Sequence, residues 1–235
     1  MIATSLASFA LLRRPEPRTI KSMRLLTTTC IVFWGGFAIM VLEIVGARYL
    51  AIGFGASFYN WISQIGVILI AMSLGYYVGG ALADRFERVT FLGWLLIPAG
   101  VFTGLIPLFA IWIMDWIVMR HPPDQSIPIL WQKLDPALGS ALIFLGPCFV
   151  LAMLSPAMIR VATRDVSHVG RISGLIYAAS TVGSIAGVFV SGYILIDIMR
   201  LSRIFYVTGG IIVLLGVLCL GVDRWLREKE QDVQA

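Results

Sequence analysis

Charge is scarce in this sequence: Asp, Glu, Lys and Arg make up 13% of its 235 residues, whereas 59% are hydrophobic. An ordinary soluble domain has about 25% charged residues, because polar groups must cover much of its surface. Helices that face lipid have no such need, since the bilayer replaces water as the solvent. The scarcity of charge therefore excludes a single water-soluble domain and favours an integral membrane protein.

Cysteine and histidine are sparse as well. Cys30, Cys148 and Cys219 are far apart, with no Cys-x-x-Cys or Cys/His cluster that could hold a metal ion or a disulfide framework. We interpret them as small core or lipid-facing residues. His121 and His168 both fall in predicted loops, so histidine ligation of a haem or chlorophyll at membrane depth is not expected. We predict no cofactor and no metal site.

A nucleotide-binding fingerprint is missing too. Gly53 and Gly55 form a Gly-x-Gly, but they follow an apolar helix instead of a strand, and the third glycine is absent. The net charge of +5 comes from basic residues in short segments between apolar runs, where such residues orient membrane helices. Neither an enzyme nor a nucleic-acid-binding protein is expected.

Long apolar runs are what the sequence has in abundance. Six occur, at 25–50, 59–83, 91–119, 137–159, 170–196 and 204–221. A membrane-spanning helix needs about 20 such residues. The sequence therefore predicts an all-α, polytopic protein with a six-helix membrane domain at 25–221. Residues 1–24 are expected to form a cytoplasmic or interfacial segment that is not a cleaved signal peptide, and 222–235 a cytoplasmic tail.

Basic residues are unevenly divided between the two sides of these helices. Thirteen of the 18 Lys and Arg residues lie in the two ends or in the loops after the second and fourth helices. The other side has Arg48, Arg120, Lys133, Arg200 and Arg203. Because loops rich in Lys and Arg stay in the cytoplasm, we expect both termini to be cytoplasmic.

The longest connection, 120–136, is on the predicted outer side. Pro122, Pro123, Pro128 and Trp131 favour a turn-rich loop that leans on the membrane surface, either as a docking surface or as a plain connector. Four tryptophans near outer helix ends are typical of an aromatic belt: Trp61, Trp112, Trp116 and Trp131.

Small residues recur one turn apart in the second and fifth helices. The stretches 73–79 and 181–187 each have a hydroxyl residue, an aliphatic residue and then Gly-x-x-x-Gly. Small residues let two backbones approach closely, so we expect these helices to cross tightly, with each other or with a partner. The opposite directions of the two helices indicate a 3+3 inverted repeat, as in many transporters. The predicted packing faces are Gly75 with Gly79, and Gly183 with Gly187 and Ser191.

The second helix ends in the string Gly-Ala-Leu-Ala-Asp-Arg-Phe-Glu-Arg at 80–88. Its charged residues Asp84, Arg85 and Arg88 lie in a tight turn, where a carboxylate and nearby arginines can latch two helices together on the inner side. The string resembles the loop motif between the second and third helices of major facilitator superfamily transporters.

Three longer stretches, 42–61, 73–85 and 154–192, carry a wider resemblance. They resemble the membrane half of bacterial spermidine synthase-like proteins, in which a facilitator-like helical domain precedes a soluble aminopropyltransferase domain. The resemblance covers about 25–220 and implies half of a major-facilitator-like fold in a bacterial inner membrane. It carries over no catalytic residue, because only a short tail follows Gly221.

Glu43 is an ionisable residue deep inside the first predicted helix. It lies about 28 Å from Arg24 along a straight helix at roughly 1.5 Å per residue, in the outer third of the bilayer. Such a group is costly unless it faces protein, water or an opposite charge. Glu43 is therefore either a transport group or a structural pin that bonds to a neighbouring helix. Arg48 lies outside the helical spacing for a pair with it and is expected to snorkel outward.

Three functions fit these patterns. The scarcity of intramembrane charge favours a non-catalytic membrane subunit or scaffold that packs against a partner membrane protein. Alternatively, a half-size facilitator-like transporter could work as a homodimer with Glu43 lining its site. The third function, a membrane anchor for a separate aminopropyltransferase, rests on the resemblance alone. The expected partners are the lipid bilayer and another membrane protein or a second copy.

Overall fold

The computed structural model describes residues 18–86, 90–122, 127–163 and 169–234, with side chains from 22 to 222 within these ranges. The described residues form helices joined by turns, without a strand. Six helices are long and apolar enough to cross a membrane. The prediction of an all-α, multi-pass membrane protein is therefore confirmed.

The first three spans are single helices: α2 (Arg18–Phe54), α3 (Phe58–Phe86) and α4 (Thr90–Val118). The fourth is composite, with α5 (Ile129–Ser140), η1 (Ala141–Leu145), α6 (Gly146–Ala152) and α7 (Leu154–Ala162). The fifth consists of α8 (Val169–Val190), η3 (Ser191–Leu195) and α9 (Ile196–Ile198), and the sixth is α10 (Leu201–Gln234).

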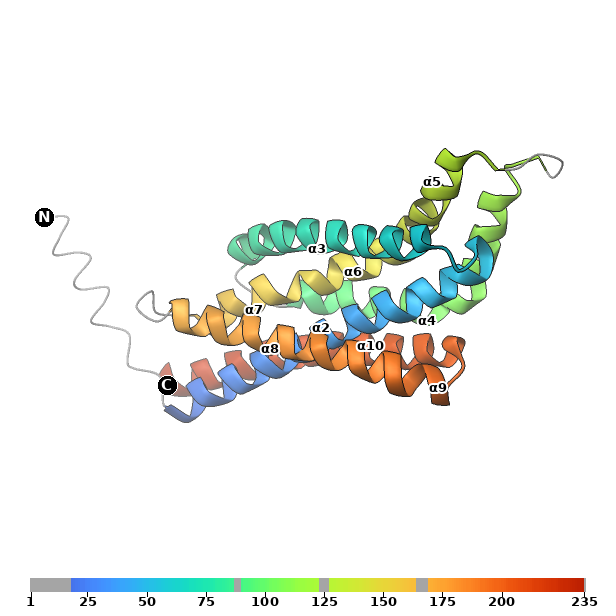
Figure 1. Ribbon diagram of the computed structural model, residues 1–235. Helices are drawn as coiled ribbons and strands as arrows, with labels where there is room; N and C mark the ends of the chain where they lie inside the picture. The colour runs from blue at the N-terminus through green and yellow to red at the C-terminus, as the bar shows by residue number, and fades with distance from the viewer. Residues whose placement is uncertain (1–17, 87–89, 123–126, 164–168, 235) are drawn as a thin grey trace, which may run out of the picture.

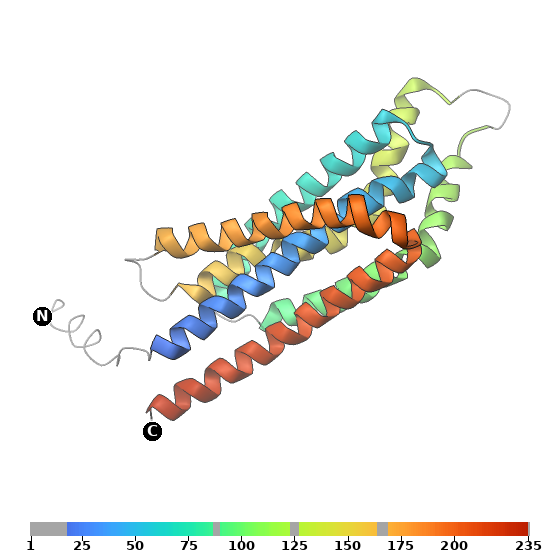
Figure 2. The ribbon, with the colours of Figure 1, turned by 60° about the horizontal axis from the view of Figure 1, so that its bottom comes forward.

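The six spans run side by side in one elongated bundle (Figure 1). Helix α2 is the central one. Of its most apolar 18-residue stretch, 67% is buried, compared with 17% of the corresponding stretch in the span that begins at Val169. Helix α8 lies along α2, α3 lies along α6 and α7, and α4 and α10 lie side by side (Figure 2). We call the end where α2 begins and α10 ends the terminal end, and the opposite end the distal end.

The core surrounds the distal half of α2. Phe144 of η1 and Phe205 of α10 are among the largest fully buried side chains, and their ring centroids are 6.1 Å apart. The Tyr49 ring meets Phe205 edge to face, with centroids 5.3 Å apart. Aromatic rings bury much apolar surface and prefer such tilted contacts. This cluster joins the first, fourth and sixth spans at the centre of the bundle.

The distal turn between α2 and α3 depends on Gly55. Its φ is 81°, a left-handed conformation that favours glycine. The Gly55 N–H donates to the Ala51 carbonyl at 3.1 Å, which closes the end of α2. The Gly-x-Gly of the sequence is thus a helix-ending turn and not a phosphate loop.

The fourth span begins earlier than the sequence predicts, and this corrects the prediction of a loop over 120–136. Helix α5 already starts at Ile129, so that Trp131, Asp135 and Pro136 are helical. Pro122 lies in the turn after α4, whereas Pro123 lies outside the described residues. Helix α5 projects beyond its neighbours at the distal end (Figure 1). The proline and charge content suggested a loop, but Asp135 is buried and paired.

Candidate functional site

The glycine pair of α3 faces the fourth span. A Cβ at Gly75 would meet the Phe149 carbonyl and the Ala152 side chain, and a Cβ at Gly79 would lie 2.7 Å from the Met153 Cα. Both contacts are with backbone or with atoms attached to it, which cannot move aside cheaply. Helix α3 therefore crosses α6 and α7 at a distance that only glycine allows.

The glycine pair of α8 faces α2 instead. A Cβ at Gly183 would meet the carbonyl of Phe33, and a Cβ at Gly187 would meet that of Phe37. Ser191 is buried and donates to the Val188 carbonyl of its own helix at 3.2 Å. The two predicted glycine faces thus pack against the fourth and first spans of the same chain rather than against one another, and neither is free for a partner.

A third glycine contact, between α4 and α10, did not emerge from the sequence. A Cβ at Gly100 would lie 2.7 Å from the Gly209 carbonyl oxygen, and one at Gly216 would lie 3.1 Å from the Gly93 carbonyl oxygen. The glycines of each helix are two turns apart and share one face. The search for glycines one turn apart missed this longer spacing, which is the signal that could have found it.

A buried polar cluster joins α2, α3 and α5, and it too was missed. Gln64 donates through Nε2 to the Leu42 carbonyl at 3.2 Å and accepts from Ser140 Oγ at 2.6 Å. Asn60 donates through Nδ2 to the Ala47 carbonyl at 2.9 Å. All three polar side chains are fully buried. Such bonds hold helices together where an unpaired polar group would be costly, so this cluster fixes the spans.

An ion-pair cluster holds the start of α5 to the end of α4 at the distal end. Asp135 accepts from Arg120 Nη2 at 3.0 Å, and its other oxygen lies 2.7 Å from His121 Nε2. The Arg120 guanidinium also lies over the rings of Trp116 and Trp131, at 5.7 and 5.4 Å from their centroids. These contacts explain why a carboxylate can lie in the first turns of an apolar helix.

Replacing Asp135 with Asn is expected to destabilise the protein by about 1–3 kcal/mol, the usual cost of leaving a buried charged or polar group with poorer partners. The measurement is unfolding by SDS titration in mixed micelles. Asp115→Asn is the control, because Asp115 is an exposed acid on α4. Equal stability of Asp135→Asn and the unchanged protein would mean that the pair does not hold α5.

Asp84 and Arg85 lie in the last helical turn of α3, and not in a turn after the helix as the sequence predicted. Asp84 Oδ1 lies 3.3 Å from Arg160 Nε on α7, with exposed fractions of 77% and 48% for the two side chains. Arg85 lies over the Phe86 ring at 5.8 Å, and Arg88 lies outside the described residues. Exposed ion pairs contribute about 0–1 kcal/mol, so this pair orients α3 and α7 more than it stabilises them.

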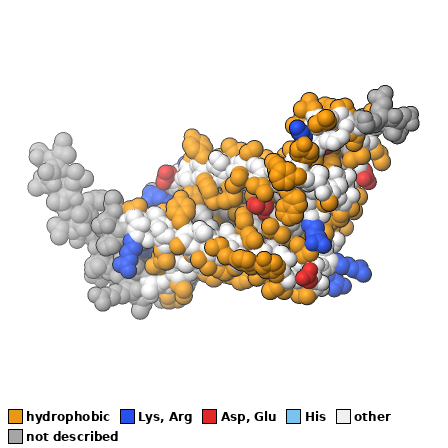
Figure 3. All heavy atoms as spheres, viewed as in Figure 1, with side chains coloured by type: hydrophobic (Ala, Val, Ile, Leu, Met, Phe, Trp, Pro, Cys, Tyr) orange, Lys and Arg blue, Asp and Glu red, His pale blue; other side chains and the backbone are white. Residues whose placement is uncertain are grey.

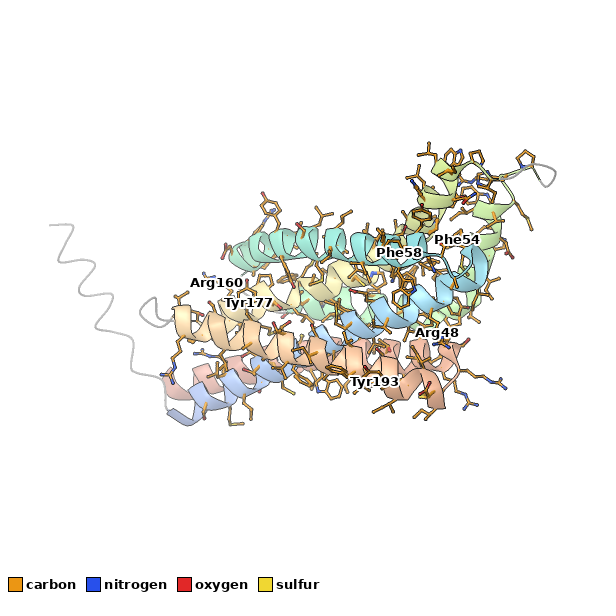
Figure 4. All side chains as sticks on the ribbon, viewed as in Figure 1. Arg48, Phe54, Phe58, Arg160, Tyr177 and Tyr193 are labelled. Atoms are coloured by element: carbon orange, nitrogen blue, oxygen red, sulfur yellow. The ribbon has the colours of Figure 1, made fainter. Side chains whose placement is uncertain are left out.

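Glu43 lies on α2 where α8 and the fourth span flank it. It is half-buried, and among the described residues it makes no hydrogen bond and no ion pair. The buried thiol of Cys148 on α6 interacts with it electrostatically. Arg48 points elsewhere and is exposed toward the distal end (Figure 4). Glu43 thus bonds to no described residue of its own chain.

The predicted cysteines and tryptophans have the expected surroundings in the described structure. Cys30 is exposed, Cys148 and Cys219 are buried, and all three thiols are free, which confirms their interpretation. No group of His, Cys, Asp and Glu in the described residues could hold a metal ion. The four tryptophans of the predicted belt are exposed on the distal half of the bundle: Trp61, Trp112, Trp116 and Trp131.

Comparison with known proteins adds no relative: no family model, no curated protein and no solved structure matches this chain. The class that the fold defines is a multi-pass α-helical membrane protein. The resemblance to spermidine synthase-like membrane domains stays a prediction.

Proposed function

We propose that this chain is a non-catalytic integral membrane subunit that packs against a partner membrane protein. The observation that carries the proposal is Glu43, a half-buried carboxylate that has no bonded partner among the described residues. Ionisable groups at membrane depth almost always face protein, water or an opposite charge. A protein neighbour that covers this face meets that need.

The state of the other polar groups supports a subunit over a transporter. A transport path needs polar groups that face an open route through the membrane. In the described spans, Gln64 and Ser140 are bonded to each other in the core, and Thr103 donates to the Ala99 carbonyl of its own helix at 2.8 Å. These polar groups are bonded within the protein and do not face an open route, so they do not form a polar path together with Glu43.

The half-size transporter is the second candidate, and one observation favours it. Glu43 lies on the first span beside the fourth and fifth spans. Glycines of the second span contact the fourth span, and glycines of the fifth span contact the first. An inverted repeat of three helices relates these two contacts, because it matches the second span with the fifth and the fourth with the first. The repeat and the facilitator-like half fold therefore stay part of the proposal. A homodimer would then enclose Glu43. The aminopropyltransferase anchor has no such observation.

The mass of the particle after gentle extraction from its native membrane tests the proposal, together with identification of each protein present. A stoichiometric complex with another membrane protein is expected. A monomer or a homodimer without other proteins would contradict the subunit function and lead to transport assays with Glu43→Gln. A soluble aminopropyltransferase as the sole companion would support the anchor instead.

Photo-crosslinking locates the contact within that complex. A crosslinking residue at Leu69 on α3 or at Val188 on α8, both exposed, is expected to capture the partner. The matched control is Leu108, which is 68% exposed on α4 at the opposite side of the bundle. Capture from Leu108 but not from Leu69 or Val188 would place the partner elsewhere.

A further inference from the structure

Exposed side chains of α3 and α8 flank Glu43, and we call this surface the α3–α8 face. Tyr76 of α3 and Tyr177 of α8 are exposed toward the terminal end of this face, and Tyr76 is 12 residues, or about 18 Å at roughly 1.5 Å per residue, beyond Gln64, which bonds to the Leu42 carbonyl. Leu69 shares the side of Tyr76 on α3, and Val188 shares that of Tyr177 on α8, by helical spacing. Figure 3 shows acidic atoms in the middle of this view, surrounded by hydrophobic side chains. The exposed side chains on both sides of the half-buried Glu43 are therefore mainly apolar.

The described residues bring no base to Glu43. In the described spans, Lys and Arg side chains lie toward the ends, as Arg48 and Arg160 do in Figure 4. A second copy related by an axis along the membrane normal would place its residues at the same depths. It would therefore offer a second carboxylate, but no cation, to the Glu43 of its neighbour.

We propose that a transmembrane helix of a different protein lies along the α3–α8 face and bonds Glu43 through a basic or other nitrogen-donor side chain at the membrane depth of Glu43. This inference rests on the proposed function and names the chemistry of the partner. Hydrogen bonds to charged groups are stronger than neutral ones. The exposed apolar side chains on both sides of Glu43 supply the packing surface for such a helix.

Protection of Glu43 in the native assembly is the first test. Dicyclohexylcarbodiimide is an apolar reagent that modifies carboxyl groups within membranes, and the adducts are mapped by mass spectrometry of the Glu43 peptide. We expect modification in the chain separated from its partners and strong protection in native membranes. The Glu43→Gln protein identifies the signal, because it has no carboxyl group at this position.

Recovery of the partner with Glu43 variants is the second test. Glu43→Gln keeps a hydrogen-bonding group and is expected to retain most of the partner, whereas Glu43→Leu is expected to weaken the complex about tenfold or more. Asp115→Leu removes an exposed acid on α4 and is expected to change nothing. SDS unfolding of the separated Glu43→Leu chain checks that the variant folds.

The outcomes separate this inference from the proposed function. Absence of any complex overturns both. A complex in which Glu43 is modified as readily as in the separated chain, or in which Glu43→Leu binds the partner fully, overturns the inference and leaves the subunit function standing. Protection of Glu43 in a particle that holds two copies of this chain alone favours the homodimer and overturns the different-protein partner.

Discussion

Replacing Gly183 with Ala is expected to reduce the free energy of unfolding by about 3 kcal/mol, near the upper end of the usual cost of overpacking. The new methyl group would meet the carbonyl of Phe33, a backbone group that cannot rotate away. Helix α8 must then separate from α2, its main neighbour, and lose the close contact that holds helices together in lipid. SDS titration in mixed micelles measures the change.

Gly174→Ala is the matched control on the same helix. Nothing lies within 4 Å of a Cβ at Gly174, and the residue is exposed. Alanine is a better helix former than glycine by about 1 kcal/mol, so this variant is expected to be as stable as the unchanged protein or slightly more stable. Similar losses for both variants would mean that glycine content, and not the α2–α8 contact, determines stability.

Replacing Gly209 with Ala is expected to cost about 3 kcal/mol as well, because its Cβ would lie 2.6 Å from the Gly100 carbonyl oxygen and 2.7 Å from the Gly104 nitrogen. The contact between α4 and α10 has backbone on both sides, so neither helix can yield without moving as a whole. Unfolding in mixed micelles again reports the change.

The adjacent residue supplies the control in this case. A Cβ at Gly210 meets nothing within 4 Å, so Gly210→Ala is expected to be neutral or stabilising. The two variants differ by one position in the same helix and have the same composition. If Gly210→Ala loses as much stability as Gly209→Ala, the register of the α4–α10 contact is different from the one described.

The spans could be predicted because their signal is local. The six apolar runs correspond to the six spans of the structure, with the largest difference at the start of the fourth. The interiors of α4 and α10 needed no knowledge of their neighbours, since a run of apolar residues long enough to cross the bilayer must form a helix to satisfy its backbone. Length and hydropathy together therefore decide the fold class.

Asp135 illustrates where that local signal ends. A carboxylate whose partners are unknown predicts a loop. The partners of Asp135 are Arg120 and His121, which are 15 and 14 residues away on the other side of the connection. Burial of a paired charge extends the helix to Ile129. The cost of a charged residue depends on its neighbours in space, which the sequence pattern does not give.

The glycine motifs illustrate the same division. The spacing of Gly75 with Gly79 and of Gly183 with Gly187 predicts a close approach of two backbones, and the structure contains both. The spacing does not identify the helix that approaches, because a helix face lined with small residues can pack closely against many other helices. Only the three-dimensional arrangement assigns these faces to the fourth and first spans.

The sequence by itself determined that this protein is a bundle of six membrane helices with a carboxylate, Glu43, deep inside the first of them, because hydropathy, length and charge act on each segment separately. The tertiary structure decided which glycine faces meet, how Asp135 is neutralised, and that Glu43 bonds to no described residue of its own chain. Each of these depends on contacts between residues distant along the chain, and packing of all six helices at once selects among them.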